Sequence, residues 1–159
     1  MHVLVWVAPG TWPAAVAAAR HRPGEDTITL VAADDPAESL PSGPLGGLMG
    51  RSLRDPLPEL ATLTAAEARA LLGQAAAALG RPCVTRLATG PTERVITAAA
   101  GDADWLIIAR DGDRSRLGPH SLGRHARFII DHAPCTVELI WPDTAPGLGT
   151  IPPPPDRRR

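Results

Sequence analysis

The sequence contains no tyrosine, a single phenylalanine and two cysteines, and all 16 of its basic residues are arginine. With so few aromatic rings, the core must be built mainly from aliphatic side chains. The two cysteines, Cys83 and Cys135, are too few for a disulfide framework. Each stands at the head of an apolar run, which favours two core thiols over a disulfide or a metal-binding pair.

Long apolar runs and an excess of one charge are also missing. No run approaches the roughly 20 residues that a membrane-spanning helix needs, and the first residues lack the basic segment and apolar core of a secretory leader. The net charge of −1 and the pI near 6.5 argue against a nucleic-acid-binding surface. We therefore expect a cytoplasmic protein whose partners include neither a membrane nor a nucleic acid.

What the sequence does contain is a regular alternation of short apolar runs and amphipathic segments. The 159 residues, 44% of them hydrophobic, suffice for one domain with a single core. Apolar runs predict five strands at residues 3–7, 27–33, 83–88, 105–109 and 135–141. Strands that alternate with helices predict an α/β fold with a parallel sheet, right-handed crossovers and helices on both faces, a doubly wound, Rossmann-like arrangement.

Helix boundaries are predicted from capping residues. Thr11 can cap the first helix, and Thr64 with Glu67 forms a capping box at the start of the second. Ser121 is expected to cap the last helix, which ends at His132, where the helix dipole favours a histidine.

Two segments differ from the rest in composition. Residues 36–63 form a long loop rich in proline and glycine with at most a short helix, and residues 143–159 form a tail rich in proline and arginine that we expect to be disordered. The remaining residues, within 1–142, form the domain. A loop of this length after the second strand would lie beside any pocket at the carboxyl ends of the strands.

Residues 107–137 resemble the C-terminal signature of the universal stress protein family. The resemblance rests on three pieces of sequence: Ile107 to Gly112 after the fourth strand, the pair Leu122-Gly123, and the closing run His132 to Val137. It extends more weakly from Val3 to about Trp141. The resemblance implies a five-stranded sheet in the order 3-2-1-4-5, with a nucleotide pocket where the first and fourth strands end.

The resemblance also implies which positions would bind an adenine nucleotide such as ATP. Carried over residue by residue, the candidate contacts are Ala8, Pro9, Ala32, Ala109, Arg110, Gly112, Gly123 and Arg124. No metal site is implied.

Several of these positions depart from the family pattern. Ala8 replaces the usual aspartate, and Ala109 replaces a glycine that lets the backbone approach the ligand. The loop between Gly112 and Gly123 holds ten residues, one more than the family's nine. Arg124 replaces a phosphate-binding hydroxyl residue. These departures predict weak or absent ATP binding.

The sequence leaves three functions open. The leading interpretation is a non-catalytic stress-response protein whose nucleotide contacts are degraded, with slow ATP hydrolysis left open. A second is a genuine ATP binder in which Arg124, with Arg110, Arg114 and Arg116, replaces the missing contacts. A third is a protein-interaction module in which Leu48 and Met49 dock a partner. The competing view of these arginines is that they are solvated loop residues that bind no ligand. Asp111 and Asp113 would then partly balance their positive charge.

The last strand carries a separate prediction. In the family it lies at an edge of the sheet and pairs with its twofold mate, so the resemblance implies a homodimer. Its β-branched and apolar residues fit this role. The candidate interface residues are Thr136, Val137, Glu138, Leu139 and Ile140.

Overall fold

Five strands run in the same direction in the computed structural model of the chain, which describes residues 1–38 and 57–155. They form one sheet in the order β3-β2-β1-β4-β5, and every neighbouring pair is parallel. The predicted fold class and strand order are therefore confirmed. The bounds of the strands are β1 His2–Trp6, β2 Thr27–Asp34, β3 Val84–Thr89, β4 Trp105–Ala109 and β5 Thr136–Ile140.

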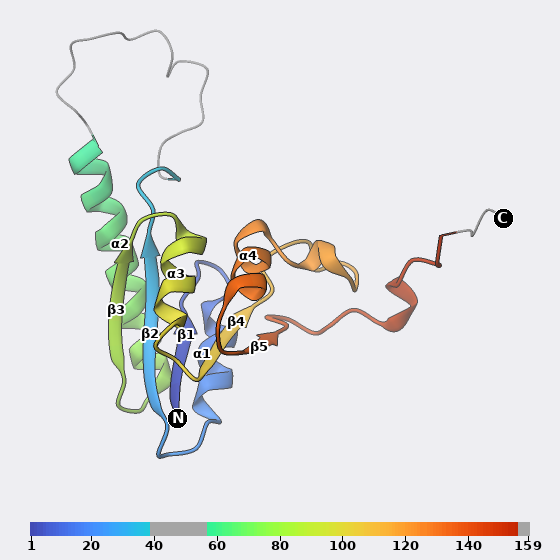
Figure 1. Ribbon diagram of the computed structural model, residues 1–159, viewed down its shortest axis with the longest axis horizontal. Coiled ribbons are helices and arrows are strands. Elements are labelled where there is room, and N and C mark those ends of the chain that lie inside the picture. Colours follow the sequence, from blue (N-terminus) through green and yellow to red (C-terminus); the bar gives the residue numbers. More distant parts are fainter. Residues whose placement is uncertain (39–56, 156–159) are drawn as a thin grey trace, which may run out of the picture.

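Two layers of helices cover the sheet (Figure 1). Helices α1 (Trp12–Arg20) and α2 (Leu57–Leu79) pack on one face, and α3 (Thr92–Ala100) and α4 (Arg124–His132) pack on the other. The central strand divides its side chains between the two faces, because neighbouring residues of a strand point in opposite directions. Val3 and Val5 join the core under α1 and α2, and Leu4 and Trp6 join the core under α3 and α4.

The second helix begins earlier than its capping box predicted. Helix α2 starts at Leu57, seven residues before Thr64, so the helical spacing continues upstream through an apolar stretch that sequence analysis had assigned to the loop. The rest of that expected loop, residues 39–56, lies outside the described residues, and so do Leu48 and Met49.

The predicted caps of α1 and α4 are confirmed in part. Thr11 lies at the N-cap of α1, but its side chain makes no capping hydrogen bond. Ser121 belongs to a short 3₁₀ helix, η2 (Pro119–Ser121), and its Oγ donates to the carbonyl of Gly118 at 2.7 Å. Helix α4 begins later, at Arg124, with Gly123 at its N-cap. The cap role predicted for His132 is confirmed, since its Nδ1 donates to the carbonyl of Phe128 at 2.7 Å.

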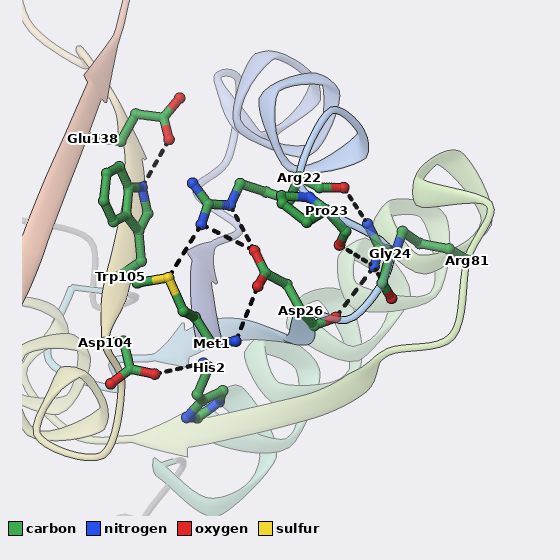
Figure 2. Close-up of polar contacts among 10 residues, drawn as sticks. All are labelled: Met1, His2, Arg22, Pro23, Gly24, Asp26, Arg81, Asp104, Trp105 and Glu138. Atoms are coloured by element: carbon green, nitrogen blue, oxygen red, sulfur yellow. Dashed lines mark hydrogen bonds and ion pairs between the residues drawn. The ribbon is translucent and has the colours of Figure 1, made fainter.

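The amino-terminal end of the sheet is fastened by polar contacts (Figure 2). Asp26 accepts hydrogen bonds from the amino group of Met1 and from Arg22, both at 3.0 Å. The Met1 amine, together with Arg22, outweighs burial and lowers the pKa of the Asp26 carboxyl. Arg81 lies just after α2 and donates, over 2.8 to 3.2 Å, to the backbone carbonyls of Arg22, Pro23, Gly24 and Asp26. These contacts hold the loop between α1 and β2 against the connection that leads into β3.

The chain after β5 leaves the sheet as an arm along the loop that follows β4. Arg114 pairs with Asp143 at 3.3 Å, and the N–H of Leu117 donates to Oγ1 of Thr150 at 3.0 Å. A single 3₁₀ turn, η3 (Leu148–Thr150), lies in this arm. The described part of the tail, as far as Pro155, thus has contacts that its composition did not predict.

Two further predictions can be compared with the structure. Cys83 and Cys135 are both free thiols and flank the two edge strands, β3 and β5, as expected. Among the described helices, none is long and apolar enough to cross a membrane.

Candidate ligand-binding site

A cavity of about 420 Å³ opens at the carboxyl ends of β1 and β2. It lies beside the point where the chain reverses its direction of winding, because β1 is flanked by β2 on one side and by β4 on the other. Ligands of doubly wound sheets bind at this point. Its apolar lining combines Trp6 with small and aliphatic residues: Val7, Ala8, Pro9, Ala32, Ala33, Ala68 and Leu71.

The polar groups of the cavity are mostly carboxylates. Among the described residues that line it are four acidic side chains and no arginine; the acidic ones are Asp35, Glu38, Glu67 and Asp111. Thr92 and His125 complete the polar lining. The cavity therefore offers hydrogen-bond acceptors and negative charge where a phosphate group would need donors and positive charge.

Asp111 occupies the N-terminus of α4. Its Oδ1 accepts the N–H of Gly123, the N-cap residue, at 2.7 Å. A helix N-terminus carries unpaired N–H groups and the positive end of the helix dipole, so it is the natural place for an anion. Here the anion is a carboxylate of the protein itself.

Asp35 makes the same kind of contact at the neighbouring helix. Its Oδ2 accepts the N–H of Thr92, the first residue of α3, at 3.1 Å. The N-termini of α3 and α4, both at the carboxyl edge of the sheet, are thus capped by acidic side chains that line the cavity.

Glu38 connects the end of β2 to both of these helices. One of its oxygens contacts the guanidinium of Arg124 and lies 2.7 Å from Nε2 of His125. Its other oxygen accepts the hydroxyl of Thr92 at 3.5 Å. Partial burial raises the pKa of Glu38, but hydrogen bonds and positive charge from Arg124 and His125 outweigh it, so the pKa is lowered.

His125 lies between two carboxylates. Its Nδ1 is 2.7 Å from Glu93 and its Nε2 is 2.7 Å from Glu38. The ring therefore joins the start of α4 to a carboxylate on α3 and to a carboxylate after β2. A hydrogen bond from the backbone of Glu93, with His125 adding to it, lowers the pKa of the Glu93 carboxyl.

The structure separates the predicted nucleotide contacts into two groups. Ala8, Pro9 and Ala32 line the cavity. The other five are not part of its lining and belong to the end of β4, the loop after it and the start of α4: Ala109, Arg110, Gly112, Gly123 and Arg124.

Three of the arginines near this loop have partners within the protein. Arg110 donates to the hydroxyl of Ser121, and its guanidinium lies 4.5 Å from the ring centre of Trp141. Arg124 pairs with Glu38, and Arg114 pairs with Asp143.

Sequence analysis missed Asp35, Glu38 and His125 as residues of the cavity, and it treated Asp111 as a partner for loop arginines. For Asp111 a signal was present, since an aspartate beside the glycine of a strand-to-helix loop is well placed to cap the helix. For Glu38 there was none, because its contacts are with residues far along the chain.

The model of the universal stress protein family matches residues 8–140. The chain belongs to the universal stress protein family. A search of curated proteins finds no match to it.

Several solved structures share its fold. The universal stress protein UspA from Lactobacillus plantarum is 21% identical, with 88% of this chain and 97% of that chain covered and a TM-score of 0.59. Hypothetical protein MJ0577 is 15% identical, with 91% of this chain and 97% of that chain covered and a TM-score of 0.69. A universal stress protein family protein from Arabidopsis thaliana, solved with AMP bound, is 14% identical, with 91% of this chain and 93% of that chain covered and a TM-score of 0.55. At these identities the likeness shows the fold.

Proposed function

We propose that this universal stress protein is a non-catalytic stress-response protein with an adenine-nucleotide-type pocket that binds ATP weakly or not at all. The observation that carries the proposal is the cavity at the switch point, with an apolar wall from Ala8, Ala32 and Leu71 and a lining of carboxylates. The wall suits a flat base, whereas the carboxylates repel phosphates. The family relative with AMP bound supports the choice of an adenine ligand.

Equilibrium dialysis against labelled adenosine and ATP tests this function. We expect adenosine to bind and ATP to bind at least tenfold more weakly. Ala33→Phe should abolish adenosine binding by filling the cavity, whereas Ala17→Phe, on the exposed face of α1, should not change it. No adenosine binding, or submillimolar ATP binding by the unchanged protein, would refute the proposal.

The arginine-based alternative has less support from the contacts. It requires Arg124 and Arg110 to face a ligand phosphate, but Arg124 pairs with Glu38 and Arg110 bonds Ser121. The interaction-module alternative centres on Leu48 and Met49, which lie outside the described residues. A cytoplasmic location and the absence of catalysis remain predictions of the sequence, and phosphate release from ATP would reveal slow hydrolysis.

We also propose that two copies associate through β5. This strand has β4 as its one neighbour in the sheet. Thr136 donates its N–H to Asp104, and the carbonyl of Ile140 accepts from Arg110, so these residues face inward. By the alternation of a parallel strand, the backbone groups of Val137 and Leu139 face outward and are available for pairing with a second copy.

A further inference from the structure

We propose that Asp111 sets the charge of the ligand that this pocket accepts, because its carboxylate stands at the N-terminus of α4 where a ligand phosphate would bind. The inference deepens the proposed function and rests on it for the adenine part of the ligand. The claim that Asp111 excludes a phosphate rests on the contacts of the loop after β4 with α4.

The carboxylate of Asp111 lies directly against the first residues of the helix. Besides the hydrogen bond of 2.7 Å from the N–H of Gly123, a Cβ placed on Gly123 would be 2.9 Å from Oδ1 and 3.0 Å from Oδ2 of Asp111. Both oxygens are therefore close to the N-cap residue. A phosphate oxygen that accepted the same N–H would have to displace this carboxylate and would be repelled by its charge.

The loop holds Asp111 in this position from both sides. The N–H of Arg110 donates to the carbonyl of Ile140 at 2.9 Å, and the N–H of Gly112 donates to Ser121 at 2.9 Å. Asp113 continues the pairing, with its N–H 2.8 Å from the carbonyl of His120. Because the residues before and after Asp111 are fixed by backbone hydrogen bonds, its side chain is presented to α4 by the fold.

The positive charge of the first residue of α4 is also compensated. Arg124, the first residue of α4, pairs with Glu38, which itself lines the cavity. A phosphate at this helix would therefore meet the carboxylates of Asp111 and Glu38. The positive charge of Arg124 is already paired with Glu38. Removal of the Asp111 charge alone leaves a neutral capping oxygen, which an anion can displace from the N–H of Gly123 without charge repulsion from this residue.

The test replaces Asp111 with asparagine and uses inorganic pyrophosphate as the probe. Asp111→Asn keeps an oxygen that can cap the helix, so the fold should be retained. The matched control is Asp113→Asn, which removes the same charge from the same loop, where Asp113 contacts Ser115 instead of α4. Asp111→Ser, which also keeps a capping oxygen, is measured in parallel.

The readout is the amide resonance of Gly123 in ¹⁵N-labelled protein during titration. We expect the dissociation constant for pyrophosphate, obtained from the shift of this resonance, to be at least tenfold lower in Asp111→Asn than in the unchanged protein. Asp113→Asn should give the same constant as the unchanged protein. An equal response in all three, or none in Asp111→Asn and Asp111→Ser, would overturn the inference.

A second titration separates the inference from the proposed function. In the unchanged protein adenosine should bind more tightly than AMP, and Asp111→Asn should reduce or reverse that preference. If adenosine binds neither protein, the proposed function fails, whereas the pyrophosphate result still decides the role of Asp111. If AMP already binds the unchanged protein more tightly than adenosine does, Asp111 does not exclude phosphate and the inference fails.

Discussion

At Gly112 the loop after β4 passes so close to the chain before α4 that no side chain fits. A Cβ at this position would lie 2.4 Å from the carbonyl oxygen of His120 and 2.9 Å from the carbonyl carbon of Ser121. These are backbone atoms of a hydrogen-bonded turn, which cannot move aside as a flexible side chain can. The glycine is therefore required by contact and is what allows Asp111 to reach the helix.

Replacement of this glycine should be costly. We expect Gly112→Ala to lower the free energy of unfolding by about 3 kcal/mol, as overpacking against fixed atoms does. Gly73→Ala is a control of opposite sign, because Gly73 lies inside α2 with nothing within 4 Å of the added Cβ, and it should raise stability by about 0.8 kcal/mol. Urea denaturation measures both, and a neutral Gly112→Ala would contradict the close approach.

At the scale of elements, Glu38 joins β2 to both helices of one face. It contacts Thr92 at the start of α3 and Arg124 and His125 at the start of α4. Its pKa is lowered from the usual 4.5, and that of Glu93, the other partner of His125, is lowered too. Both carboxylates therefore favour the folded state when they are charged.

The sign of the pH dependence follows from these directions. A carboxyl whose pKa is lower in the folded protein contributes stability above about pH 4.5, and this stability is lost as the pH falls through the folded value. We expect Glu38→Gln to have a lower free energy of unfolding than the unchanged protein at pH 7. On acidification to pH 3.5, its free energy of unfolding should fall by less than that of the unchanged protein. Glu25→Gln, on the α1–β2 loop, is the charge-matched control. Equal acid slopes for all three proteins in urea denaturation would argue against the contact.

At the scale of the whole molecule, the three inner strands β1, β2 and β4 could be predicted because each is a largely apolar run buried on both faces. The edge strands β3 and β5 carry polar residues and are only partly buried, and they were recognised from their shorter apolar stretches. The order of the strands came from the family resemblance, since local sequence does not say which strands are neighbours. The roles of Asp111 and Glu38 could not be predicted in the same way. Each depends on a contact between segments far apart along the chain, and the path of a ten-residue loop is set by tertiary hydrogen bonds such as that from Gly112 to Ser121.

The proposed dimer gives a prediction at this scale. Val137→Pro removes an outward N–H of β5 without removing a hydrogen bond to β4, so it should convert a dimer to a monomer while the fold is retained. Thr85→Pro is the matched control on the opposite edge, where β3 also has a single neighbour. Light scattering after size-exclusion chromatography gives the masses. A monomeric unchanged protein, or a dimeric Val137→Pro, would refute pairing through β5.

The two natural cysteines are placed so that distances between spin labels attached to them can distinguish the two possible interfaces of such a dimer. Cys135 directly precedes β5, whereas Cys83 directly precedes β3 at the far edge. In a pair joined through β5, spin labels on the two Cys135 side chains would lie within about one strand length, roughly 20 Å. Labels on the two Cys83 side chains would be separated by the width of both sheets, roughly 40 Å. Pulsed electron resonance on single-cysteine variants would therefore identify which edge faces the partner, with no new cysteine introduced.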